Sequence, residues 1–168
     1  MDKKVEKAAA KVKAKAAPRK KLTGLADHLL EHTPAEDVAA YDKSSLQRAA
    51  ALAESALARH RKGETVIAID TDDSVTRQGK PISVITVVND NMPFLFDSLS
   101  GEITDAAGQP FLVTHPVYAV HHTKSGVDRV ISDAAAKGET DIDKVSLIHV
   151  HVARLTSEQG DRLRQRLE

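Results

Sequence analysis

Histidine is the residue whose spacing in this chain most suggests a chemical site. His149 and His151 lie two residues apart in an apolar segment, so a strand would place both imidazoles on one face of a sheet. His115 and the pair His121-His122 lie in an earlier apolar segment that we expect to form a neighbouring strand. Several imidazoles on one sheet face could ligate zinc or copper. Because the chain has no cysteine and no carboxylate at a fixed spacing to these histidines, we predict no metal site.

The same histidines have a second interpretation. We expect His115, His149 and His151 to line an interface or the solvent-facing side of the sheet, with the alternate apolar residues on the helix-covered side. An imidazole there would change charge near pH 6.5 and could tune association.

A polar turn followed by a proline and an apolar helix forms a second candidate site. The first backbone amides of a helix favour an anion by roughly 0.3–1 kcal/mol. The carboxylate of an amino acid could bind these amides, and Asp90 or the asparagine side chains could hold its ammonium group. In the alternative interpretation, Asn91 caps the helix and the other polar residues serve the turn. The residues of this candidate ligand site are Asn89, Asp90, Asn91, Met92, Pro93, Phe94 and Leu95.

The sequence carries none of the common catalytic motifs. There is no glycine-rich dinucleotide or phosphate loop and no G-x-S-x-G nucleophile turn. Asp70, Asp72 and Asp73 cluster in a predicted turn, where solvation is favoured over a Mg²⁺ site. The strands that would face RNA, Ile82–Val88 and Val145–Leu155, lack aromatic residues, so we do not expect nucleic-acid binding. We predict no catalytic residue in this chain.

Composition bounds the class of protein. The chain has 168 residues, of which 41% are hydrophobic and only 3% aromatic, so its core must be aliphatic. Residues 1–21 hold nine Lys and Arg against two acidic residues, whereas the remaining 147 hold 15 basic and 22 acidic residues. No stretch approaches the roughly 18 apolar residues of a membrane helix, and no apolar segment of a secretory signal follows the basic start. We expect a cytoplasmic protein with no membrane contact.

The N-terminal third is expected to be helical after a disordered tail. Residues 1–21 are rich in Lys and Ala, and we predict that this basic tail is disordered. Residues 22–63 form a helical lead-in, within which Thr33-Pro34-Ala35-Glu36 has the pattern of a capping box. Asp42 is the expected N-cap of a long helix over residues 43–62, and Gly63 its terminator.

Residues 64–168 are expected to form an α+β domain. We predict strands at Thr65–Thr71, Ile82–Val88, Phe111–His122, Val127–Ile131 and Val145–Leu155, and helices at Pro93–Ala107 and from Thr156 onward, where Thr156-Ser157-Glu158-Gln159 has the pattern of a capping box. The third strand should bend at Pro116, and Asp72–Lys80 should be a connection. The order βαββα(β) lacks only the last strand of a ferredoxin-like antiparallel sheet with helices on one face. We expect Thr65–Thr71 to take that place, antiparallel to Ile82–Val88, in a domain truncated after its last helix.

Four segments carry a family resemblance. The polar turn with its proline resembles the ligand loop of ACT domains, which bind amino acids. VVNDNMPFLFDSL (Val87–Leu99), VTHPVYAV (Val113–Val120) and IHVHVARL (Ile148–Leu155) resemble the N-terminal region of the large bacterial NAD-specific glutamate dehydrogenases. HTPAEDVAAYDKSSL (His32–Leu46) resembles the helical segment that precedes it. The resemblance covers roughly residues 25–168.

The resemblance implies a function for the parent chain. This family deaminates glutamate oxidatively to 2-oxoglutarate with NAD, in a catalytic domain far downstream. We therefore expect no catalysis and no cofactor here, and NAD only in that downstream domain. The region would sense amino acids or hold the enzyme together, with the downstream domains, a homo-oligomer partner and a free amino acid as its partners. The alternatives are an oligomerisation module without a ligand and a free-standing small-molecule sensor.

Overall fold

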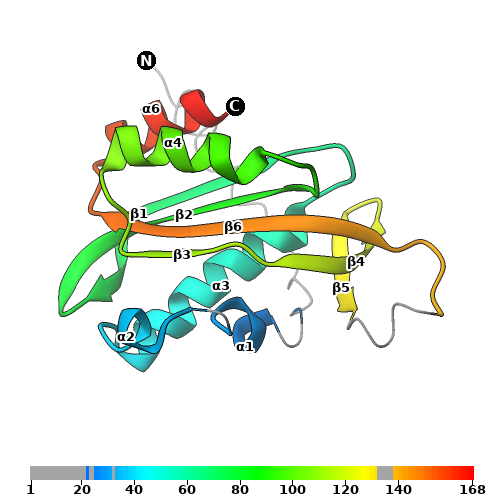
Figure 1. Ribbon diagram of the computed structural model, residues 1–168, viewed down its shortest axis with the longest axis horizontal. Coiled ribbons are helices and arrows are strands. Elements are labelled where there is room, and N and C mark those ends of the chain that lie inside the picture. The colour runs from blue at the N-terminus through cyan, green and yellow to red at the C-terminus, as the bar shows by residue number, and fades with distance from the viewer. Residues whose placement is uncertain (1–21, 23–24, 32, 132–137) are drawn as a thin grey trace, which may run out of the picture.

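The computed structural model describes residue 22, residues 25–31, residues 33–131 and residues 138–168 (Figure 1). The predicted tail at residues 1–21 lies outside this part of the chain, as does the stretch 132–137 between β5 and β6. The described residues confirm the predicted α+β class.

Six strands form the sheet, and every pairing in it is antiparallel. The strands are β1 (Val66–Arg77), β2 (Lys80–Asp90), β3 (Leu112–Thr114), β4 (Val117–Thr123), β5 (Gly126–Ile131) and β6 (Asp143–Ala153). Their order is β1-β2-β6-β4-β5, and β3 also pairs with β6. Strand β1 therefore lies beside β2, where the last strand of a ferredoxin-like unit would lie, as predicted. The short strand β5 and the break of the third strand at His115-Pro116 are also confirmed.

The prediction of a connection over Asp72–Lys80 is wrong. Strand β1 continues to Arg77 and forms a hairpin with β2 through Gln78 and Gly79, whose φ angles are 50° and 73°. Two central residues with positive φ are typical of the two-residue hairpin turn that matches strand twist. The register jumps between the pairs Asp70↔Val84 and Val75↔Ile82, so the acidic cluster occupies a β-bulge. The polar composition of a bulge resembles that of a loop, which explains the error.

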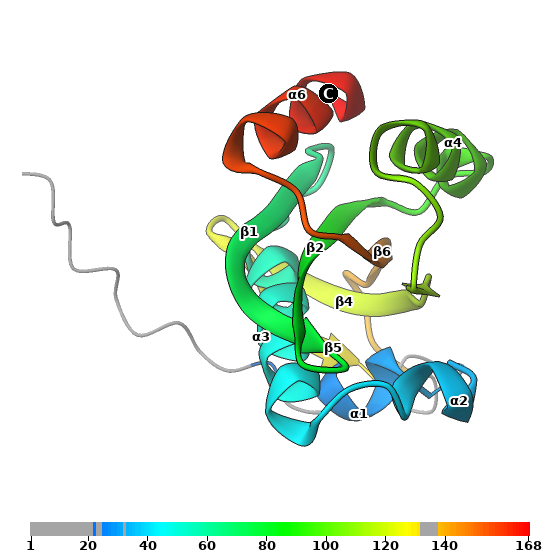
Figure 2. The same cartoon turned by 90° about the vertical axis from the view of Figure 1, so that its left-hand side faces the viewer.

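Two helices cover one face of the sheet (Figure 2). Helix α4 spans Leu95–Ala107 and helix α6 spans Ser157–Leu167. The predicted capping box at Thr156 is present, since its hydroxyl accepts from Gln159 N and the Gln159 side chain accepts from Thr156 N. The buried core between these helices and the sheet consists of Ile85, Val87, Leu99, Ile103, Ile148, Val150, Val152, Leu155, Leu163 and Leu167.

The helical lead-in covers the opposite face. Helices α1 (Leu25–Leu29), α2 (Ala35–Val38) and α3 (Lys43–Arg59) lie below the strands in Figure 1. Asp42 caps α3 as predicted, accepting from Ser45 N at 2.7 Å. The apolar stripe of α3, the side that it buries, is rich in alanine, and these small side chains let the helix lie close to the sheet. Its buried alanines are Ala49, Ala50, Ala53 and Ala56. The largest buried cluster on this side contains Leu22, Leu25, Leu29, Ala50, Ala53, Ala56, Leu57, Val88, Tyr118, Val120, Val127, Val145 and Leu147.

Two predictions for the lead-in are wrong. Thr33 does not cap a helix: α2 has Pro34 at its N-cap without a side-chain hydrogen bond, and the buried Thr33 hydroxyl has no partner among the described residues. Pro34 has no side-chain oxygen that could accept from the first amides, and the Asp37 and Val38 amides donate to the Pro34 carbonyl instead. Helix α3 ends at Arg59, because His60 adopts an extended backbone (φ −65°, ψ 131°) that directs its ring into the core. Gly63, with φ 79°, lies in the turn beyond.

Candidate functional site

The predicted ligand loop continues the sheet before it turns. Asn89 and Asp90 still pair with β6, opposite Ser146 and Val145. The Asn91 N–H then donates to the Lys144 carbonyl at 3.0 Å. The polar residues of this segment are therefore fixed by backbone pairing rather than grouped around a cavity.

The Asp90 carboxylate does not face the start of helix α4. Its Oδ2 accepts from the Gly63 N–H at 2.8 Å, and its Oδ1 lies 3.5 Å from His60 Nε2. Both contacts lie in the connection between α3 and β1, on the face of the lead-in. The structure therefore does not bring Asp90 together with the first amides of α4, as an amino-acid site there would require.

Helix α4 begins without a side-chain cap, so the alternative role of Asn91 as its cap is wrong. The N-cap position belongs to Phe94, whose backbone is left-handed with φ 63° and ψ −2°. A bulky residue in this region costs about 1–3 kcal/mol unless its surroundings impose it. The Phe94 ring is 80% exposed, and Met92 two residues earlier is 49% exposed. The loop therefore presents two large apolar side chains to solvent in a strained, fixed backbone.

His115 lies at the margin of the α4 face. Its ring stacks on Phe96 with 4.9 Å between the centroids, and its Nε2 is 2.6 Å from the Ser146 hydroxyl. Partial burial lowers the pKa of this imidazole below its usual value. On either side of His115, Val113 in β3 and Val117 at the start of β4 are exposed.

His149 and His151 share one face of the sheet, as predicted. That face is covered by the lead-in and is not exposed to solvent or to a partner. Both rings are fully buried between the sheet and the lead-in. Their Nε2 atoms lie 3.0 Å apart, while His149 Nδ1 is 2.9 Å from Thr86 Oγ1 and His151 Nδ1 is 2.9 Å from the Tyr41 hydroxyl. Burial lowers the pKa of His151 to about 4 and that of His149 well below its usual value. The lead-in occupies the side where we expected an interface or solvent.

A second histidine pair was missed by the sequence analysis. His60 Nδ1 lies 3.0 Å from His122 Nε2, and His122 Nδ1 lies 2.8 Å from Asp143 Oδ2. Lys62 Nζ donates to the other oxygen of Asp143 at 2.8 Å. A signal for His60 exists: it continues the apolar stripe of α3, three residues after Leu57, at helical spacing.

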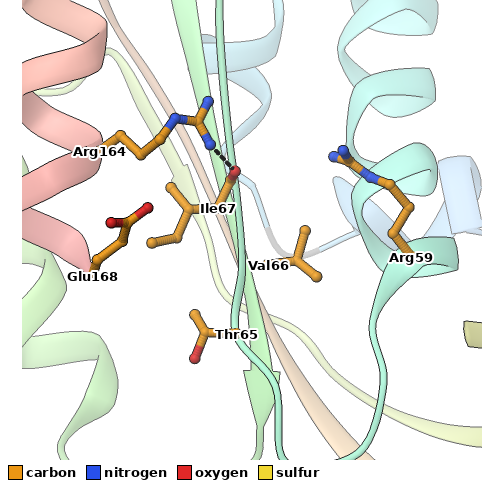
Figure 3. Close-up of a pocket in the computed structure, with 6 residues that line it drawn as sticks. All are labelled: Arg59, Thr65, Val66, Ile67, Arg164 and Glu168. Carbon is orange, nitrogen blue, oxygen red and sulfur yellow. Dashed lines mark hydrogen bonds between the residues drawn. The ribbon is translucent and has the colours of Figure 1, made fainter.

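The hollow drawn in Figure 3 lies along the outer edge of β1. Its volume is about 380 Å³, and its lining comes from Arg59, Thr65, Val66, Ile67, Arg164 and Glu168. Arg164 from α6 donates to the Ile67 carbonyl, while Arg59 lies on the α3 side of the strand (Figure 3). No residue of the predicted ligand loop lines this hollow.

Neither a metal-binding cluster nor a membrane-spanning helix occurs among the described residues. Among them, no group of three or more His, Cys, Asp or Glu side chains could hold a metal ion. None of their helices combines the length and the apolar character needed to cross a membrane.

The fold and these surfaces define an α+β domain with a ferredoxin-like sheet. The chain matches the family described as "Glutamate dehydrogenase, ACT1 domain" over residues 25–167, and it therefore belongs to that family. This domain is not the cofactor-binding catalytic domain of such an enzyme. Comparison with curated proteins and with solved structures found no significant match.

Proposed function

We propose that this chain is an assembly domain of an NAD-specific glutamate dehydrogenase in the cytoplasm, and that it docks on another part of that enzyme through the β2–α4 loop. We call residues Asn91–Phe94 the docking loop. The partner would be a downstream domain of the same chain or a second copy of the enzyme, which oxidatively deaminates glutamate to 2-oxoglutarate. The observation that carries this proposal is Phe94, 80% exposed and held in a left-handed conformation at the start of α4.

The energetics of Phe94 favour docking over a passive surface role. Burying a phenylalanine side chain contributes about 1.5–3 kcal/mol, and this gain is unused while the ring stays in solvent. The backbone on either side is fixed, by Asn91 N–H to Lys144 O before it and by Ser98 N–H to Phe94 O after it. A partner would therefore meet a pre-ordered aromatic anchor and would not have to order the loop itself.

The test uses Phe94→Ser in the full-length enzyme, with Val113→Ser as the matched control. Val113 is also an exposed apolar residue, at 40%, but it lies in β3, outside the docking loop. Sedimentation velocity across a concentration series should show assembly weakened at least tenfold by Phe94→Ser, about 1.4 kcal/mol. Val113→Ser should assemble as the wild type does. Unchanged assembly of Phe94→Ser, at an unchanged melting temperature, would contradict the docking role.

A second candidate function is amino-acid sensing, and the hollow beside β1 favours it. Two guanidinium groups border it, and guanidinium pairs well with a carboxylate. Glu168, on the same wall, could accept from an ammonium group. The hollow is large enough for a free amino acid.

Calorimetric titration with the twenty amino acids tests this candidate. Saturable binding should be lost in Arg164→Gln and kept in Arg162→Gln, because Arg162 on the same helix contacts Glu158 instead. If Asp90→Asn abolishes binding and Arg164→Gln does not, the binding site lies in the Asn89–Leu95 loop instead of the hollow. If none of the twenty amino acids binds, amino-acid sensing by this domain is refuted.

A further inference from the structure

Four side chains from four separate segments form one continuous line at the end of the sheet that carries the docking loop. In order they are Asp90 at the end of β2, His60 after α3, His122 on β4 and Asp143 on β6. The three contacts between their facing atoms are 3.5, 3.0 and 2.8 Å long. The middle of the line is buried, since His60 is fully covered and the His122 side chain is only 10% exposed.

With neutral imidazoles and ionised carboxylates, these four side chains supply one proton fewer than their three contacts need to become hydrogen bonds. Each contact joins two atoms that can both accept, so each needs one proton to become a hydrogen bond. Two neutral imidazoles supply two protons, and ionised carboxylates supply none. Two contacts have hydrogen-bond length, while the third, between His60 Nε2 and Asp90 Oδ1, is 3.5 Å long. Those two atoms are buried without a hydrogen-bond partner in the described part of the chain.

Lys62 determines which contact lacks the proton. Its ammonium group holds Asp143 Oδ1 at 2.8 Å. The hydrogen bond from Lys62, and then that from His122, hold the pKa of Asp143 below its usual value, so this carboxylate stays ionised. His122 Nδ1 must then carry a proton to face it, which makes His122 Nε2 the acceptor and His60 Nδ1 the donor. The lone pair of neutral His60 therefore points at Asp90.

We propose that His60 and Asp90 form a binding site for one exchangeable proton, and that this proton clamps the docking loop to the α3–β1 connection. A proton on His60 Nε2 converts two facing acceptors into a charge-assisted hydrogen bond. The other oxygen of Asp90 already holds Gly63 N–H, and the next residue, Asn91, begins the loop. Tightening Asp90 against His60 therefore adds a restraint at the base of the loop that carries Phe94, beside the Asn91–Lys144 backbone bond that already orders it.

The charged groups around His60 set where the proton is taken up. Burial is the largest influence and lowers the pKa of His60, and repulsion by His122 adds to it. Attraction by Asp90 from β2, and then the backbone and the carboxylate of Glu64 from the α3–β1 connection, oppose them. At the other end of the line, Asp143 and Asp141 raise the pKa of Lys62. The net direction is downward, so the proton binds as the pH falls below 6.5, and the docking loop is clamped on the acidic side.

NMR titration of the 168-residue chain, with ¹⁵N-labelled histidine, tests proton binding. The His60 ring should report one protonation event, and the resonances of the His122 ring should move at the same midpoint, because its Nε2 lies 3.0 Å from His60 Nδ1 and shares that hydrogen bond. Asp90→Asn keeps an acceptor for Gly63 N–H but removes the charge, so it should weaken proton binding at least tenfold, one pH unit. The control, Asp128→Asn, breaks the analogous His121–Asp128 contact of 2.8 Å on the β4–β5 hairpin and should leave the midpoint of His60 unchanged. Independent titration of the two rings, or an unchanged midpoint in Asp90→Asn, would overturn the proton site.

The link to the docking loop has its own readout in the same titration. The amide resonances of Asn91, Met92 and Phe94 should move with the midpoint of His60 in the wild type, and this response should follow the lower midpoint in Asp90→Asn. Loop amides that stay flat through the His60 midpoint would overturn the clamp.

An effect on assembly rests on the proposed function and is measured separately. In the full-length enzyme, assembly should be at least threefold tighter at pH 5.5 than at pH 7.5, with this ratio reduced in Asp90→Asn. If Phe94→Ser leaves assembly intact, the docking role fails while the proton site, read from the histidine rings, stands. A pH ratio in Asp90→Asn equal to that of the wild type would refute the regulatory link alone.

Discussion

Acidification from pH 7 to pH 4 should destabilise this domain through His149 and His151, the two rings buried between the sheet and the lead-in. In the folded chain, burial lowers the pKa of His151 to about 4 from the ordinary value of 6.5, and lowers that of His149 as well. Between these pH values the unfolded chain binds more protons than the folded one. Stability that is fully present above pH 6.5 is therefore lost as the pH falls towards 4.

The size of this loss follows from the shift of His151. A difference of about 2.5 pH units between the unfolded and the folded pKa corresponds to about 3 kcal/mol. His149 adds a loss of the same sign. Small domains are stable by about 5–15 kcal/mol, so a change of this size is a large fraction of the whole.

Urea unfolding, followed by circular dichroism at pH 7, 6, 5 and 4, measures this loss. The reference is the double variant His149→Leu/His151→Leu, which leaves every other ionisable side chain in place. Between pH 7 and 4 the wild type should lose at least about 3 kcal/mol more unfolding free energy than this variant. Parallel curves for the two proteins would refute the reasoning, because the buried rings would then not be neutral in the fold.

Two further predictions concern local structure. Gly126→Ala should destabilise the fold by about 2 kcal/mol or more, since its Cβ would lie only 2.1 Å from Ala58 O at a φ of 135°. Gly101→Ala, in helix α4 with open space around it, should be neutral or stabilising by up to about 1 kcal/mol. Thr156→Ala should cost about 1 kcal/mol through loss of the capping box, whereas Thr33→Ala should not weaken the fold, because its hydroxyl caps no helix. Thermal unfolding checks each pair, and equal changes within a pair would contradict the assignment.

The sequence was informative wherever the determining interaction is local. Short runs rich in valine and isoleucine located the central strands, the capping pattern at Thr156 located α6, and Pro116 located the break between β3 and β4. The position of β1 beside β2 was also predictable, because the two strands are adjacent in the chain and one place in the sheet was vacant. These features depend on residues a few positions apart, or on one hairpin.

The covering of the second sheet face was not predicted, although a signal was present. The segment Val145–Val152 carries apolar or histidine side chains on both faces, except at Ser146. A strand with this pattern is typically buried on both sides. We assigned the histidine face to an interface or to solvent, so its burial beneath the lead-in was not expected. The alanine-rich stripe of α3 was the matching partner, and together they indicate a helix lying against this face.

The behaviour of the two histidine pairs depends on what lies at the ends of each line. Both pairs have a nitrogen–nitrogen distance of 3.0 Å and both are shielded by the lead-in. The His149–His151 pair ends on the hydroxyls of Thr86 and Tyr41, which bring protons of their own, so its three contacts need no extra proton and the pair stays neutral. The His60–His122 pair ends on two carboxylates, which bring none. Histidine spacing cannot distinguish these cases, because the terminal groups come from residues 21 to 110 positions away in the chain. The structure supplies these neighbours, and from them it follows that one pair should resist protonation while the other should bind a proton and act on the docking loop.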